Sequence, residues 1–295
     1  MIKQLSLFIG FVFFSVVLSA QNDMDQVRQE YEQMMNDPKI PYGKNTAVGK
    51  YYDIRGFRMY VETYGQGEPL LLIHGNGGAI NNFLKQIPFF EKKYKVIVAD
   101  SRAQGRSADG GDSLSYEMMA DDYAALLDAM KIDSAYVLGW SDGGINGLLL
   151  SMRHPQKVKK LAITGANLRP DNTAVFPEVW DLVRPAYTEL KDKTNKNAEE
   201  RNGFKLLRLL IEQPNIPAAS LSNVQCPTLV IGGDHDVIRE EHTMEIFQHL
   251  PRAYLWIMPN SGHATAIVYA DEFNQKVEVF FKTPFRKYDA AGRFF

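Results

Sequence analysis

The stretch Gly139-Trp140-Ser141-Asp142-Gly143 contains the residue types that nucleophilic chemistry requires. It has the form G-x-S-x-G and stands between an apolar run and an amphipathic pattern of helical period. In that context the serine sits on a sharp turn from strand to helix, and glycine, which lacks a Cβ, lets the two elements close on each other. The pattern predicts an exposed Ser141 hydroxyl with free backbone N–H groups beside it.

A serine hydroxyl is a weak nucleophile and needs a base within hydrogen-bond reach. Among the six histidines, His263 alone follows the last predicted strand, at the carboxyl edge where the sites of α/β proteins assemble. A surface-loop histidine is the alternative interpretation. The acid that orients the imidazole is expected after the apolar run 228–231, where Asp234 and Asp236 compete.

Acyl transfer also needs N–H donors aimed at the developing oxyanion, each worth about 3 kcal/mol. We expect the residue after the nucleophile, Asp142, to supply one of them. The loop after Ile73 is expected to supply the other, from Asn76 or, as the alternative, from Gly77. His74 in the same loop is interpreted as a hydrogen-bonding partner that fixes the loop.

Strand-like and helical patterns alternate from residue 51 onward. Strands are predicted at 51–55, 57–64, 70–73, 95–99, 135–138, 160–164, 228–231 and 253–258, and helices at 80–92, 115–130, 144–152 and 271–281. The first two strands should form a hairpin about Gly56. Alternation over this length predicts an α/β fold, with a doubly wound, mostly parallel sheet covered by helices on both faces.

One connection is much longer than the others. About sixty residues separate the strands ending near 165 and beginning at 228, more than a strand-to-helix loop needs. Helical patterns at 176–190 and 198–212, with turns at Pro170, Pro185 and Pro214, predict a helical cap inserted before the acid-bearing strand.

Two tryptophans are candidates for substrate contacts. Trp140 stands beside the nucleophile, and Trp180 lies in the predicted cap. The interior of the cap itself is the alternative place for Trp180.

Composition narrows the classes of partner. The 295 residues carry a formal net charge of −2 with no clustered basic face, so no nucleic-acid partner is expected. We find no histidine pair at metal-ligand spacing on a shared helical face and no dinucleotide fingerprint, so neither a metal nor an organic cofactor is implied. The expected partner is a small ester-like molecule.

The N-terminus has the pattern of a signal peptide. Lys3 precedes an apolar run at 5–18, and Ser19 and Ala20 offer small residues for cleavage. A retained transmembrane anchor is the alternative interpretation. The run is shorter than the roughly 20 residues of a spanning helix, so we expect an exported, periplasmic or secreted protein without stable membrane insertion. Residues 21–50 would form an arm on the main domain.

From about residue 51 to 281 the chain resembles a capped α/β-hydrolase. The motifs that carry the resemblance are HGNGG at 74–78, DSRAQGRS at 100–107, the elbow around Ser141, GDHD at 233–236 and NSGH at 260–263. The elbow, read as GWSDGG, is similar to that of the biphenyl hydrolase-like group, which includes valacyclovir hydrolase. The resemblance implies a core of residues 51–166 and 223–295 with a cap at 167–222.

The resemblance also implies roles for residues. Asp236 ends the G-x-x-D stretch in which this family carries its acid, so the triad would be Ser141, Asp236 and His263, in the chain order of the family. Ala103 replaces the customary glycine of the D-x-R-G-x-G-x-S turn, although alanine tolerates a positive φ poorly.

Asp142 bears on specificity. An acid beside the nucleophile would repel anionic substrates and could pair with a cation such as an α-amino group. In valacyclovir hydrolase the matching aspartate recognises the amino group of the substrate, and the resemblance implies the same here. The alternative is that the side chain only forms hydrogen bonds within the elbow.

These residues predict an exported serine hydrolase that cleaves carboxylic esters through an acyl-enzyme, with amides and amino-acid esters as further candidates. Carbon–carbon bond hydrolysis and cofactor-free haloperoxidase chemistry are alternatives for the same fold and triad. A ligand-binding member without turnover is the alternative from another functional class.

Overall fold

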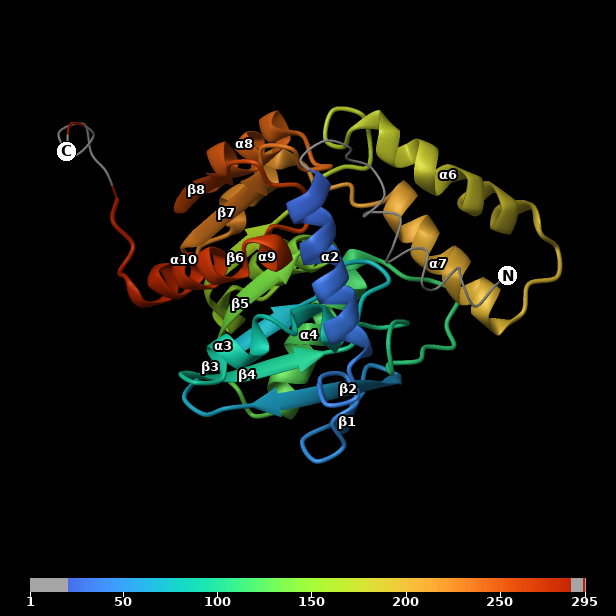
Figure 1. Cartoon of the computed structure of the whole chain (residues 1–295), viewed down its shortest axis with the longest axis horizontal. Coiled ribbons are helices and arrows are strands. Elements are labelled where there is room, and N and C mark those ends of the chain that lie inside the picture. Colours follow the sequence, from blue (N-terminus) through green and yellow to red (C-terminus); the bar gives the residue numbers. More distant parts are fainter. Residues whose placement is uncertain (1–20, 288–293, 295) are drawn as a thin grey trace.

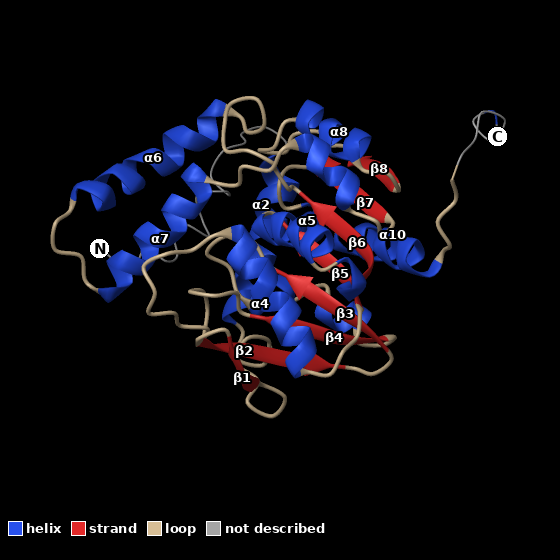
Figure 2. Cartoon of the chain, turned by 180° about the vertical axis from the view of Figure 1, so that it is seen from behind, coloured by secondary structure: helices blue, strands red, loops and turns tan. Residues whose placement is uncertain are grey.

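The computed structural model describes residues 21–287 and 294, so the predicted signal peptide at 1–20 lies outside them. An eight-stranded sheet runs through the centre of the molecule with helices on both faces (Figure 1, Figure 2). The strands are β1 (Lys50–Ile54), β2 (Phe57–Tyr64), β3 (Glu68–Ile73), β4 (Tyr94–Ala99), β5 (Ala135–Trp140), β6 (Val158–Thr164), β7 (Thr228–Gly233) and β8 (Ala253–Met258).

The strand order is β1-β2-β4-β3-β5-β6-β7-β8. β1 pairs with β2, and β2 with β4, in antiparallel fashion, whereas all pairs from β4 to β8 are parallel. The predicted hairpin and the mostly parallel, doubly wound sheet are therefore confirmed. The carboxyl ends of β3 to β8 meet at one edge, which gathers the loops that follow them.

The α-helices are α2 (Gln21–Asn36), α3 (Ile87–Phe90), α4 (Tyr116–Ala129), α5 (Asp142–Arg153), α6 (Pro177–Asp192), α7 (Ala198–Glu212), α8 (Glu240–His249), α9 (Thr265–Val268) and α10 (Ala270–Lys282). Side chains of α4 and α5 belong to one buried cluster, and side chains of α3 and α10 belong to another. Because successive residues of a strand point to opposite faces, the central strands contribute apolar side chains to both clusters.

The continuous helix expected over 80–92 is wrong. The structure has a 3-10 turn at Ile80–Phe83 and the short helix α3, which has Pro88 in its first turn. Proline lacks the N–H that would continue a helix from the preceding turn. In addition, the N–H of Ile80 donates to a carboxylate oxygen of Asp100 at 2.9 Å, so a side chain satisfies it.

Helices α6 and α7 come between β6 and β7 in the sequence. In space they form a pair beside the sheet (Figure 1). The turn expected at Pro185 is wrong, because α6 continues through that residue. The cost of a proline inside a helix is offset here by an amphipathic face, on which Val179, Trp180, Val183 and Leu190 are buried.

Within the part of the chain that the structure describes, we find no helix long and apolar enough to cross a membrane.

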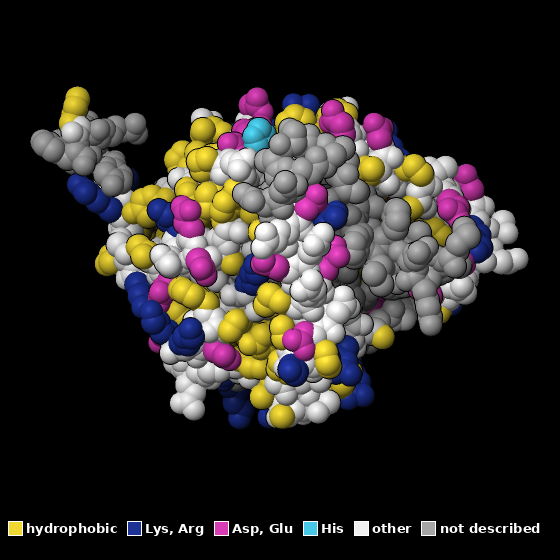
Figure 3. Space-filling model, in the orientation of Figure 1, with side chains coloured by type: hydrophobic (Ala, Val, Ile, Leu, Met, Phe, Trp, Pro, Cys, Tyr) yellow, Lys and Arg dark blue, Asp and Glu magenta, His cyan; other side chains and the backbone are white. Residues whose placement is uncertain are grey.

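On the face shown in Figure 3, Lys and Arg side chains are interspersed with Asp and Glu.

Candidate active site

Ser141 lies at the turn between β5 and α5 with φ 57° and ψ −121°, a conformation that costs a non-glycine residue energy. Its N–H donates to the carbonyl of Thr164 at 2.8 Å. The neighbouring glycines make the turn possible: a Cβ at Gly139 would lie 2.1 Å from the carbonyl oxygen of Gly143, and one at Gly143 would lie 1.9 Å from that of Ile73. Only glycine fits at either position.

The loops after β7 and β8 bring an acid and an imidazole together. His263 Nδ1 lies 2.6 Å from Asp236 Oδ1, and both side chains are buried. The same oxygen accepts the N–H of Ile238 at 3.1 Å. Asp234 instead accepts the N–H of Ser261 at 3.0 Å, so it fixes the turn that precedes the histidine. Of the two competing carboxylates, Asp236 is the one that contacts His263.

Gly165, which sequence reasoning took only as the end of a strand, closely approaches this pair. It has φ +64°, and a Cβ there would lie 2.6 Å from His263 Cε1 and 3.4 Å from Asp236 Oδ2. The pattern that could have revealed it is a glycine directly after a buried parallel strand, at the carboxyl edge of the sheet.

The segments that carry the predicted oxyanion donors, Asn76 and Asp142, lie beside Ser141. The loop after β3 approaches so closely that a Cβ at Gly75 would lie 3.1 Å from that of Ser141. No acceptor among residues 21–287 takes the N–H of Asn76. Asp142 is the first residue of α5, so its N–H has no acceptor within the helix. The positive end of the helix dipole also favours an anion at this place.

The side chain of Asp142 is buried and turns toward the oxyanion loop. Its Oδ2 accepts a hydrogen bond of 2.9 Å from Asn76 Nδ2, which also contacts the carbonyl of Leu206 in α7 at 3.3 Å. Burial raises the pKa of Asp142 to about 6, against the lowering effect of hydrogen bonds from Asn76 and Tyr116. No Lys or Arg in the described part of the chain forms an ion pair with this carboxylate.

His74 fixes the oxyanion loop in its neutral form. Its Nε2 accepts the N–H of Ser101 at 2.9 Å, so the proton must reside on Nδ1, which donates to the carbonyl of Gly75 at 2.8 Å. Burial lowers the pKa of His74 to about 4, which keeps the ring neutral at pH 7.

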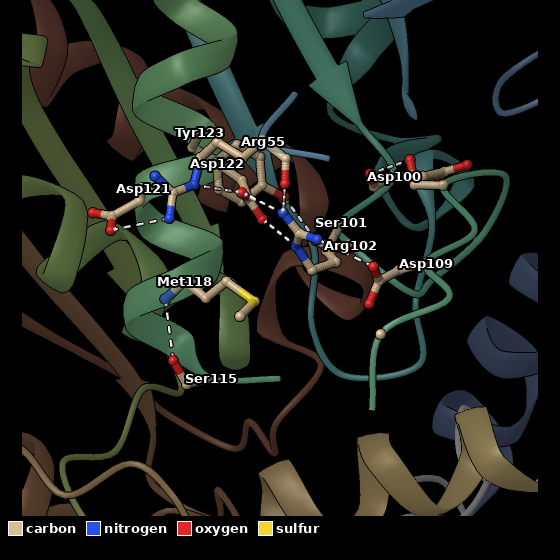
Figure 4. A network of polar contacts seen from close by, with 12 residues as sticks. Arg55, Asp100, Ser101, Arg102, Asp109, Ser115, Met118, Asp121, Asp122 and Tyr123 are labelled. Atoms are coloured by element: carbon tan, nitrogen blue, oxygen red, sulfur yellow. Dashed lines mark hydrogen bonds and ion pairs between the residues drawn. The ribbon is translucent and has the colours of Figure 1, made fainter. Parts of the chain in front are cut away.

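The loop after β4 is held by buried ion pairs (Figure 4). Arg102 donates to both oxygens of Asp122 at 2.7 and 2.8 Å and to Asp109 at 3.1 Å. Lys205 of α7 donates to the other oxygen of Asp109 at 2.9 Å, which ties α7 to this loop. Ala103 in the loop has φ 65°, so an alanine occupies the left-handed conformation in which glycine is customary.

The two tryptophans lie in different surroundings. Trp140 donates its indole N–H to the carbonyl of His263 at 2.9 Å. Trp180 of α6 is buried in a cluster with Val183, Leu207 and Ile238. Among the described residues, no group of three His, Cys, Asp or Glu side chains is placed to hold a metal ion.

Comparison with known proteins gives consistent matches. A family described as "alpha/beta hydrolase fold" matches residues 68–200. The chain is 28% identical to Serine hydrolase BPHL of Mus musculus, over 83% of this chain and 89% of the relative. It is 26% identical to 2-hydroxymuconate semialdehyde hydrolase of a Pseudomonas species, over 81% of this chain and 94% of the relative. The crystal structure of the enol-lactonase from Burkholderia xenovorans matches with a TM-score of 0.68 at 21% identity, over 79% of this chain and 100% of that one.

Proposed function

Because the chain belongs to the α/β-hydrolase superfamily of enzymes, we propose that it is a serine hydrolase that cleaves carboxylic esters. The observation that carries the proposal is the buried pair of His263 Nδ1 and Asp236 Oδ1 at 2.6 Å. This pair lies on loops at the same edge of the sheet as the strained turn at Ser141.

The proposed reaction follows from the roles that these groups can take. Ser141 Oγ attacks the ester carbonyl while His263 Nε2 accepts its proton, and Asp236 orients the ring and stabilises its charged form. The N–H groups of Asn76 and Asp142 bind the oxyanion. His263 then protonates the leaving alcohol, and water, activated by the same histidine, hydrolyses the acyl-enzyme.

A fluorophosphonate probe tests the nucleophile. We expect it to label the purified protein at Ser141, as mapped by peptide mass spectrometry, and to lose this reaction in His263→Ala. Ser141→Ala should lower ester turnover by several orders of magnitude without unfolding the chain. Folded wild-type protein that resists the probe would contradict the proposal. A substrate panel of esters, amides and carbon–carbon substrates then separates ester hydrolysis from the alternative chemistries.

Asp142 favours amino-acid esters as a second candidate substrate class. A buried carboxylate that lacks a Lys or Arg partner is costly, and an ammonium group of the substrate would neutralise it. Asp142→Asn keeps the backbone donor, so we expect it to reduce kcat/KM for aminoacyl esters far more than for the matched esters without the amino group. An equal loss for both would rule out recognition of the amine.

Export is proposed from residues 1–20, whose apolar run follows Lys3 and ends at small residues. Fractionation of cells that express the full chain, followed by N-terminal sequencing, tests this. A mature protein beginning at Gln21 outside the cytoplasm is expected, and an uncleaved cytoplasmic chain would contradict it.

A further inference from the structure

Trp140 links the nucleophile to the histidine loop. It directly precedes Ser141, and its indole Nε1 donates to the carbonyl of His263 at 2.9 Å across 123 positions of sequence. The centroids of the Trp140 and His263 rings lie 6.2 Å apart. One side chain of the elbow therefore fixes the backbone of the loop that carries the proposed base.

The segment after His263 is held by two further hydrogen bonds. In α9, the carbonyl of Ala266 accepts a hydrogen bond from Gln86 at 2.6 Å, and that of Ile267 accepts one from Lys85 at 3.3 Å. These contacts place α9 but do not orient the carbonyl of His263 itself, which receives its hydrogen bond from Trp140.

The arm covers this arrangement from outside. α2 packs beside α9 (Figure 1). Its Tyr31 is buried, and the hydroxyl donates to the carbonyl of Asn82 at 3.3 Å. Tyr31, Leu84 and Ile267 form a small buried cluster, against which Trp140 and Ala264 pack. Helix α2 thus limits the positions that the indole can take.

We propose that Trp140, backed by Tyr31 of α2, is a positioning residue that sets His263 relative to Ser141, so that the N-terminal arm supports catalysis. The inference rests on the proposed triad. Its physical basis is that proton transfer tolerates little displacement, since a shift of about 1 Å can cost about a hundredfold in rate.

Trp140→Phe in the full chain tests the proposal, because it keeps an aromatic ring and removes the N–H donor. With a neutral ester we expect kcat to fall at least about tenfold, with KM within about twofold of wild type. The downfield proton NMR signal of the Nδ1–H that His263 shares with Asp236 should weaken. The matched control is Trp256→Phe, since Trp256 packs near Phe273 with ring centroids 6.3 Å apart. This control should leave kcat and the NMR signal unchanged.

A second variant, Tyr31→Ala, keeps the indole N–H donor but removes the α2 side chain from the cluster against which Trp140 packs. It should reduce kcat and the NMR signal in the same direction as Trp140→Phe. Folded Trp140→Phe with wild-type kcat and signal would overturn the proposal. If Trp140→Phe does not fold, Tyr31→Ala with wild-type kcat and signal overturns it instead. If the wild-type protein shows no ester turnover, the proposed function is refuted but the positioning role is not. In that case the positioning role is tested by whether the NMR signal weakens in Trp140→Phe.

Discussion

At Gly165 the absence of a side chain determines whether His263 can reach Asp236. We expect Gly165→Ala to lower kcat for ester hydrolysis at least about tenfold, because the new Cβ would lie 2.6 Å from His263 Cε1 and displace the ring. Steady-state kinetics on the folded variant measure this effect.

Gly56→Ala is the matched control for Gly165→Ala. Gly56 has φ +90° but nothing within 4 Å of a built Cβ, so its substitution brings backbone strain without a clash. Equal losses of kcat in the two variants would show that strain, rather than contact with His263, is responsible.

The ionised side chain of Asp142 is predicted to lower the free energy of unfolding at neutral pH. The pKa of its carboxyl is about 6 in the folded protein, against an ordinary value of 3.8. Between these two pH values the folded state binds more protons than the unfolded state. The contribution of Asp142 to the free energy of unfolding therefore falls as pH rises from 3.8 to about 6. At 1.36 kcal/mol per pH unit, the gap corresponds to about 3 kcal/mol.

Asp142→Asn, which does not titrate, should therefore raise the free energy of unfolding by up to about 3 kcal/mol above pH 6, with the gain vanishing toward pH 4. Urea unfolding of the variant and wild type at several pH values measures this difference. A gain that does not change with pH would refute the assignment to this carboxyl.

At the scale of elements, a buried ammonium group of helix α7 ties this helix to the loop that follows β4. Lys205 Nζ donates to Asp109 Oδ2 at 2.9 Å and to the carbonyl of Gly111 at 2.8 Å. Lys205→Met leaves the buried Asp109 carboxylate without this donor, so we expect a loss of about 3 kcal/mol in the free energy of unfolding. Faster amide hydrogen exchange in α7 should accompany it.

Lys191→Met is the control for Lys205→Met, since Lys191 is an exposed lysine of the neighbouring helix α6. It should change neither the unfolding midpoint nor the exchange of α7. If Lys205→Met matches this control in both measurements, the ion pair does not fix the cap helix.

At the scale of the whole molecule, Glu62 joins the arm to the sheet. This fully buried carboxylate in β2 accepts the N–H groups of Gly43 and Asn45, both at 2.8 Å, and the hydroxyls of Tyr60 and Tyr64. Glu62→Gln puts amide hydrogens where donors converge, and hydrogen bonds to charged groups contribute about 1.5–3 kcal/mol each. We expect a loss of about 3 kcal/mol in unfolding free energy.

Urea unfolding compares Glu62→Gln with Glu68→Gln, a substitution at a half-exposed side chain that pairs with Lys159. Limited proteolysis within 37–49 should also become faster in Glu62→Gln alone. Indistinguishable midpoints for the two variants would show that this carboxylate does not anchor the arm.

Local pattern alone determined most of the fold. The elbow, the alternating strands and helices and the cap helices are set by glycine positions and hydrophobic period, which act over a few residues. The same reasoning failed at 80–92 and at Pro185. At the first, Pro88 lacks the N–H that would continue a helix, and at the second, burial of one face outweighed the cost of the proline.

Contacts between residues far apart in sequence were decided only by the tertiary structure. Asp234 and Asp236 are alike in type and stand two positions apart. The family resemblance assigned the acid to Asp236, and the approach of β7 and β8 brings that carboxylate to 2.6 Å from His263. The direction of the Asp142 side chain likewise depends on a loop 66 positions away. Sequence specifies which groups can react, but their distances depend on packing across the whole sheet, which no local pattern encodes.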